Sequence, residues 1–146
     1  MTVIDFKLEA EAAKASMKAM LERVHNPSNA MDRVGAMGWR DVMDHFKRKE
    51  GPDGPWEPFS KNTTRKRGKM ASAQLLQDTG TLRSSIKWRN EGNQVVLYTA
   101  CNYADYHEHQ HKDYGRPPQR RFLWVSDITL KNILMYVTKF LAGYVN

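Results

Sequence analysis

The sequence has a single cysteine, Cys101, and no apolar run approaching the length of a membrane span. Because Cys101 has no second cysteine to pair with, an internal disulfide is excluded, which suits assembly in a reducing cytoplasm. A bilayer-spanning helix needs about 20 consecutive apolar residues, so we expect no membrane partner. No basic leader precedes an apolar stretch at the N-terminus, so we also expect no secretory signal.

Signatures of catalysis are missing as well. Gly51 and Gly54 are not followed by the Lys-Ser or Lys-Thr pair of a phosphate-binding loop. Ser84 and Ser85 lie outside any nucleophile-elbow pattern, and nothing around Cys101 suggests an activated thiol. We therefore predict that the protein is not an enzyme and needs no cofactor.

Positive charge is abundant. Lys and Arg number 23 against 16 Asp and Glu, so the net charge is +7. Such a balance favours nucleic acid, an anionic surface or an acidic protein as partner, without choosing among them. The stretch 61–69 has five basic residues and no acid. Arg65, Lys66 and Arg67 within it are candidates for neutralising DNA phosphates or for docking on an acidic neighbouring subunit.

Three histidines alternate at His107, His109 and His111. On a strand their imidazoles would point the same way, and three histidines can bind zinc. On a helix or turn they would scatter. We favour a polar, partly exposed turn and predict no metal.

The first fifty residues predict two helices. Apolar residues recur at alternating steps of four and three, at Phe6, Ala10, Ala13, Met17, Met20 and Val24. Pro27 should end this helix at His25-Asn26, and Ser28 or Asn29 should cap a second one that stops before Gly51. A short link between two helices indicates an antiparallel hairpin. Residues 2–7 could instead begin as an edge strand.

The remainder predicts strands and a last helix. Residues 51–73 lack periodicity and are expected to form a long basic loop. Alternation around Ser84–Arg89, a turn at 90–93 and the apolar run 94–100 predict a β-hairpin. Helical spacing from Leu130 to Tyr144, with Ser126 as cap, predicts an amphipathic C-terminal helix. The expected fold is α+β, in one domain spanning residues 1–146.

The order of several short motifs resembles the phage virion morphogenesis family, whose members are described as tail completion proteins. Phe46 is followed by Pro52-Asp53-Gly54 and Trp56-Glu57-Pro58, and the most diagnostic stretch runs from Leu75 to Ile86. The matching motif positions are Gly54, Trp56, Thr79, Gly80, Leu82, Tyr103, Ala104, His107, Phe122 and Leu123. The segment between Gln110 and Arg120 departs from the family pattern.

This resemblance implies a structural virion protein without catalytic residues. It would complete the tail or join tail to head, as a tail terminator or connector, in a homo-oligomeric ring expected to be a hexamer. The ring would sit in the neck or at the tail end, touching other neck or tail proteins, with DNA in its lumen as a further candidate partner, after assembly in the host cytoplasm. The expected interface residues are Trp56, Arg65, Lys66, Arg67, Arg120 and Arg121. The alternative is a small basic nucleic-acid-binding protein.

Overall fold

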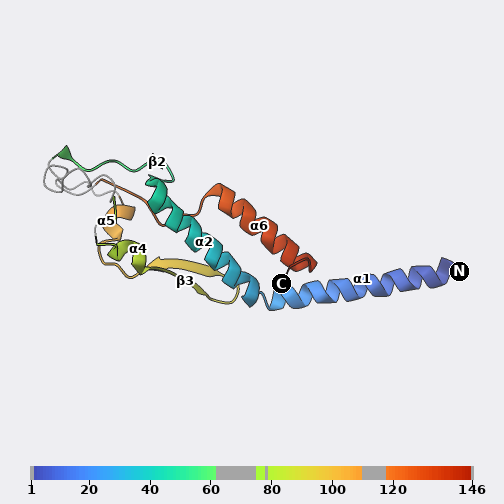
Figure 1. Ribbon diagram of the computed structural model, residues 1–146. Helices are drawn as coiled ribbons and strands as arrows, with labels where there is room; N and C mark the ends of the chain where they lie inside the picture. The colour runs from blue at the N-terminus through green and yellow to red at the C-terminus, as the bar shows by residue number, and fades with distance from the viewer. Residues whose placement is uncertain (1, 62–74, 78, 110–117, 146) are drawn as a thin grey trace.

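The computed structural model describes residues 2–61, 75–77, 79–109 and 118–145, and it does not describe the side chains of residues 2–10. Long helices lie towards both ends of the chain, with two small antiparallel sheets between them, which confirms the α+β class (Figure 1). The elements are α1 (Thr2–His25), α2 (Ser28–Arg48), β1 (Glu50–Gly51), β2 (Gly54–Pro55), α4 (Thr81–Ser85), β3 (Ile86–Asn90), β4 (Val95–Thr99), α5 (Asp105–Glu108) and α6 (Asp127–Ala142).

Helix α2 is the centre of the fold. It packs against the β3–β4 hairpin and also against α6 (Figure 1). Gly35 lets the hairpin come close, because a Cβ atom there would lie 2.6 Å from Cδ2 of Trp88. The indole of Trp39 adds a direct link, donating from Nε1 to the carbonyl of Ile86 over 3.0 Å. The glycine and the tryptophan of α2 therefore set how tightly helix and hairpin pack.

The hydrophobic core lies where α2 ends. Val42, Met43 and Phe46 of α2 are buried there, and Phe46 is completely inaccessible. Their buried partners come from later segments, namely Trp56, Leu75, Leu82, Ile86, Ala104 and Phe122. Residues far apart in sequence thus meet around the C-terminal half of one helix.

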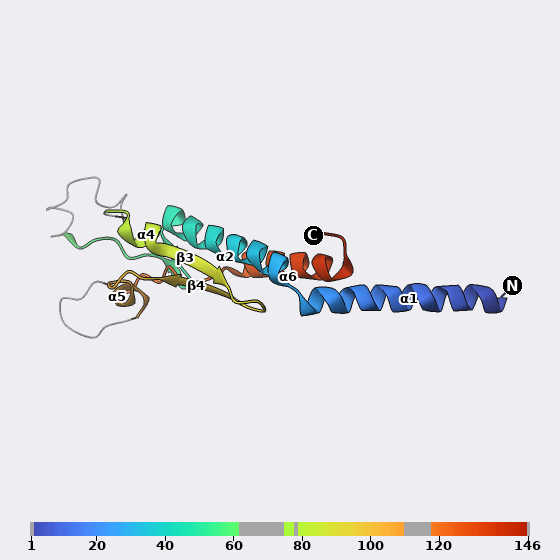
Figure 2. The same ribbon diagram turned by 90° about the horizontal axis from the view of Figure 1, so that it is seen from below.

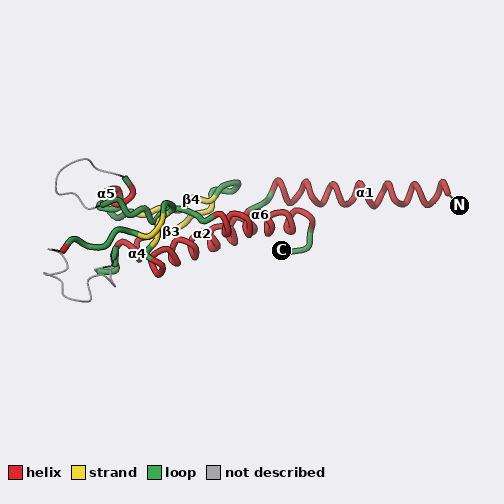
Figure 3. Tube along the Cα trace, turned by 90° about the horizontal axis from the view of Figure 1, so that it is seen from above, coloured by secondary structure: helices red, strands yellow, loops and turns green. Residues whose placement is uncertain are grey.

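Helix α1 does not fold back on α2. The two helices follow one another in roughly the same direction, and α1 projects from the body as an arm (Figures 2 and 3). The link between them is only Asn26-Pro27, and both of its residues take part in helical hydrogen bonds. The N–H of Asn26 donates to the carbonyl of Glu22 in α1, and the carbonyl of Pro27 accepts from the N–H of Met31 in α2. Because helical hydrogen bonding reaches into the link from both sides, the chain continues forward there, and the predicted antiparallel helical hairpin is wrong. The predicted end of α1 at His25 is confirmed, and residues 2–7 are helical, not a strand.

The N-terminal cap of α6 is as the sequence predicts, whereas the helix ends at Ala142, before the predicted Tyr144. Ser126 precedes the helix, and its Oγ accepts a hydrogen bond from the backbone N–H of Thr129 at 3.3 Å. Gly143 follows the helix with a φ of 83°, which places its N–H within reach of the last carbonyls. Pro27, in contrast, occupies the N-cap position of α2, so neither Ser28 nor Asn29 caps that helix.

Two local differences concern the middle of the chain. The predicted first strand begins as the short helix α4, and only Ile86–Asn90 is extended, paired with β4 in the register Trp88 to Leu97. Part of the predicted loop is a miniature hairpin, in which Glu50 pairs with Pro55. Residues 62–73 of that loop lie outside the described part of the chain.

Candidate functional site

The motif residues of three distant segments meet around Trp56, just after β2. Trp56 is 6% exposed, and its Nε1 donates to the carbonyl of Arg121 over 2.9 Å. Its ring lies edge-on to Phe46, and Phe46 also contacts Phe122, with 5.5 Å between centroids in each pair. Trp56 therefore ties the segment after α2 to the segment that precedes α6.

Arg120 strengthens the same junction from within. It is 3% exposed, and it donates from Nε to the carbonyl of Glu57 over 2.8 Å and from Nη2 to that of Pro58 over 3.2 Å. Its guanidinium also lies over the ring of Phe59. Burial lowers the pKa of Arg120, and the neighbouring charge of Glu57 acts in the opposite direction.

Helix α5 holds the other side of this junction. The carboxylate of Glu108 accepts from the backbone N–H groups of Phe122 and Leu123, at 2.8 and 2.7 Å. The carbonyl of His107 accepts from the N–H of Arg120 over 2.9 Å. Burial, assisted by the charge of Arg120, lowers the pKa of His107. His107, one of the family motif positions, is thus part of a packed junction.

The motif positions Thr79 and Gly80 make the turn that starts α4, and Leu82 follows in its first turn. Gly80 has a φ of 74°, a conformation that favours glycine, and the hydroxyls of Thr79 and Thr81 lie 2.7 Å apart across it. Leu82 then enters the core at 1% exposure. Ala104 is also buried, whereas Tyr103 stays 37% exposed. The motif positions are therefore mostly explained by packing within the chain.

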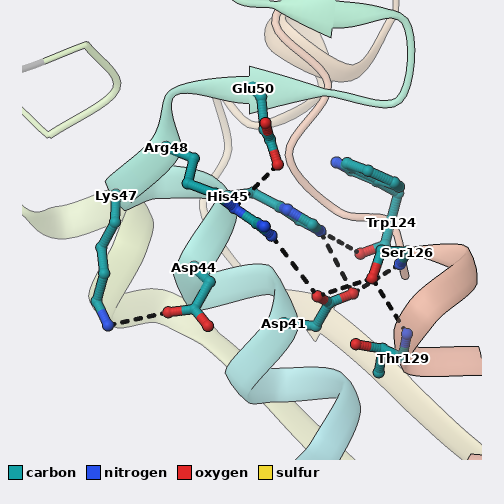
Figure 4. A network of polar contacts seen from close by, with 9 residues as sticks. All are labelled: Asp41, Asp44, His45, Lys47, Arg48, Glu50, Trp124, Ser126 and Thr129. Atoms are coloured by element: carbon teal, nitrogen blue, oxygen red, sulfur yellow. Dashed lines mark hydrogen bonds and ion pairs between the residues drawn. The ribbon is translucent and has the colours of Figure 1, made fainter. Parts of the chain in front are cut away.

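A second polar cluster joins α2 to the start of α6 (Figure 4). The carboxylate of buried Asp41 accepts from the backbone N–H of Ser126 over 2.6 Å and from its hydroxyl over 3.0 Å. His45 donates from Nε2 to the carbonyl of Trp124 over 3.2 Å and lies 3.6 Å from Asp41. Burial lowers the pKa of His45, while Asp41 and the Trp124 carbonyl oppose this. The cluster fixes the position of α6.

The candidate interface residues are placed very differently from one another. Trp56 and Arg120 are internal, and their hydrogen-bond donors serve backbone carbonyls of their own chain. Arg121 is exposed and lies 3.8 Å from the carboxylate of Asp53 in the β1–β2 turn. The three remaining candidates, residues 65–67, lie outside the described part of the chain. An interface role for the set stays a prediction, but for Trp56 and Arg120 the structure adds a clear internal role.

Nothing in the described residues resembles a metal centre. No group of three or more His, Cys, Asp and Glu side chains is placed there to hold a metal ion. His109 pairs with Asp105 over 2.7 Å, while His107 faces the interior, so these two histidines diverge. His111 is not described. Across the described helices, none is long and apolar enough to cross a membrane.

The surface carries apolar side chains on two helices. On α6, Leu130 is 50% exposed and Leu134, one turn later, is 68% exposed. On α1, Met17 is 64% exposed and Val24 is 55% exposed. A helix that is apolar on its outer face as well as its inner face is usually covered on both sides. These surfaces, rather than a cavity, are where the described chain is suited to meet a partner.

A family model for the phage virion morphogenesis family matches residues 8–142. This match covers most of the chain, so the chain is a phage virion assembly protein in the broad sense, and it belongs to the phage virion morphogenesis family. No curated protein and no solved structure matches the chain significantly. The family membership indicates a structural or assembly role in a bacteriophage virion.

Sequence reasoning missed the Asp41–His45 pair and Glu108. Their partners are distant along the chain, 85 positions away for the Asp41 and Ser126 hydrogen bond. One signal was available, because Asp41 and His45 lie four residues apart on the same side of α2 as the apolar Val42 and Phe46. Polar residues at such positions are buried only when they are paired, so they predict a specific contact without naming the partner.

Proposed function

We propose that this protein is a ring-forming subunit that completes the phage tail or joins it to the head. The observation that carries the proposal is the pair of exposed apolar helix faces, on α1 and α6, in a chain of the virion morphogenesis family. A ring gives every subunit two neighbours, so two separate apolar faces on one chain are what such an assembly uses. Following the resemblance, we expect a hexamer located at the neck or tail end.

The contacts at Trp56, Arg120 and Asp41 support this role indirectly. They join α2, the small hairpin β1–β2 and the segment before α6 into a firm body. A subunit that transmits force between head and tail needs such a body. The net charge of +7 is compatible with DNA passing through the ring's lumen.

Electron microscopy of lysates from phage lacking this gene tests the proposal. Separate full heads and tails of finished length are the expected result, because assembly should stop at the joining or completion step. Normal infectious particles would overturn the proposal and leave the alternative, a small basic nucleic-acid-binding protein. That alternative also predicts DNA binding that weakens steeply with salt, whereas a ring held by apolar contacts should persist.

A further inference from the structure

Helix α1 carries a regular seven-residue repeat. Seven of its apolar residues follow alternating steps of three and four, namely Val3, Phe6, Ala10, Ala13, Met17, Met20 and Val24, whereas Ile4, Leu8 and Leu21 are among the apolar residues outside this stripe. In heptad notation the seven stripe residues occupy a and d, the positions through which helices pair side by side. From 3 to 24 this stripe is about 32 Å long, at 1.5 Å per residue. Its regularity indicates a helix-pairing surface.

The chain itself does not use the described part of this stripe. Met17 is 64% exposed, Met20 43% and Val24 55%. The contact with α6 involves a different face of α1, where Ala19 and Arg23 are partly buried and Arg23 Nη1 donates to the carbonyl of Leu141 over 3.1 Å. In proteins, a helix gains most of its stability from packing its apolar face against other elements. The stripe on the projecting α1 has no such packing partner among the described residues.

We propose that the α1 helices of neighbouring copies of this protein pair in parallel and in register through this stripe. The inference rests on the proposed function in one respect, that copies surround a common axis. Under rotational symmetry, equivalent helices that run along such an axis are parallel to one another. The stripe on each copy then packs against the same stripe on the next copy.

The charges beside the stripe favour another copy in this orientation. By the heptad pattern Glu9 occupies a g position and Lys14 the e position five residues later. In a parallel pair, the g position of one helix lies beside the e position five residues later on its neighbour, so Glu9 would lie beside Lys14. In an antiparallel pair, e positions lie beside e positions, and because positions 7 and 14 are both lysine, like charges would meet. The pattern therefore discriminates between the two orientations.

The apolar surface along the stripe is wider at the end of α1 that precedes α2. Leu21 occupies the following e position and is 57% exposed. It adds to the apolar surface beside Met17, Met20 and Val24, whereas the two earlier e positions are lysine.

Cysteine cross-linking of the full chain tests both contact and orientation. In a Cys101→Ala background, Met17→Cys, Met20→Cys and Val24→Cys are each oxidised mildly, with Ala15→Cys as the control on the opposite side of the helix. We expect covalent dimers at all three stripe positions and none at 15. Cross-linking at one stripe position only would indicate antiparallel crossing and overturn the parallel register. Equal cross-linking at 15 would overturn the stripe.

Charge insertion provides the second test. Met17→Glu should shift the protein to monomers in light scattering after gel filtration, while Ala15→Glu, with the same charge on the opposite face, should leave the oligomer unchanged. Both positions are exposed, so circular dichroism should confirm that both variants fold. An intact Met17→Glu oligomer without cross-links would sink the inference and leave the ring proposal standing on α6. The ring proposal fails separately, if phage lacking the gene are normal.

Discussion

The indole of Trp124 lies flat against the imidazole of His45, with 4.0 Å between ring centroids and 8° between the planes. The stack covers a histidine that has no exposed surface and whose Nδ1 has no hydrogen-bond partner among the described residues. Only Nε2 is engaged, towards the Trp124 carbonyl and near Asp41. A proton added at Nδ1 would therefore enter a site without an acceptor.

This arrangement predicts that acid destabilises the fold. Burial holds the pKa of His45 below its ordinary value of 6.5, so below about pH 6.5 the unfolded chain binds a proton that the folded chain does not. The free energy of unfolding should then decrease as pH falls from 7 to 5, by at most about 1.4 kcal/mol per pH unit for one such histidine. Urea unfolding at stepped pH values measures this slope.

The variant His45→Gln should flatten that slope, because it removes the titrating group and keeps a donor for the Trp124 carbonyl. His107 should contribute with the same sign, since burial and then Arg120 lower its pKa as well. The exposed His25→Gln serves as the control. If both His45→Gln and His107→Gln left the pH dependence of the unfolding free energy unchanged, neither buried histidine would govern acid stability.

Gly35→Ala should destabilise the contact between α2 and β3. The new methyl group would meet the rigid ring of Trp88 at 2.6 Å from Cδ2, so helix and hairpin must separate. We expect a net loss of about 1–3 kcal/mol despite the better helix propensity of alanine. Gly38→Ala is the matched comparison, because its nearest neighbour is the flexible tip of Leu97 at 3.2 Å. Equal unfolding free energies for the two variants would contradict the close-packing argument.

Asp41→Asn should loosen the start of α6. The substitution removes the charge and one of two acceptors that serve Ser126, a loss of about 2 kcal/mol for a buried, charge-assisted contact. Asp44→Asn changes an exposed carboxylate three residues along the same helix and should cost less than about 0.5 kcal/mol. Denaturant unfolding of the two variants gives the comparison, and similar losses would refute an anchoring role for Asp41.

Arg120→Met and Arg121→Met form a second neighbouring pair. The first leaves the carbonyls of Glu57 and Pro58 without the buried donor, and we expect a loss of about 1–3 kcal/mol. The second removes an exposed side chain with one long ion pair and should change stability by less than about 0.5 kcal/mol. If Arg121→Met lowered the melting temperature more than Arg120→Met, the internal role assigned to Arg120 would be wrong.

Local signals in the sequence were sufficient for the parts of the fold that local chemistry determines. Pro27 marks the end of α1, and Ser126 marks the start of α6, because caps and proline act within a few residues. The alternation that predicted a strand from Ser84 failed at its start, where residues 81–85 form a helical turn instead. Over so few residues, apolar spacing alone does not separate strand from helical turn.

Long-range geometry was beyond these signals. The direction of α2 relative to α1 depends on how Asn26-Pro27 joins two hydrogen-bond patterns, which composition does not reveal. The internal contacts of Trp56 and Arg120 are made with residues more than 60 positions away in the sequence. The family resemblance identified the motif positions, but it could not say that most of them pack within the chain.

The hydrogen bonds between Asp41 and Ser126 also set an order of events during synthesis. A ribosome releases Asp41 first, and the partner that anchors it follows 85 residues later. Until then the carboxylate of Asp41 lacks the two Ser126 donors, and the imidazole of His45 lacks the Trp124 carbonyl. A chain cut short before Ser126 therefore has neither these contacts nor helix α6, and α2 keeps an acid and a histidine without their distant partners.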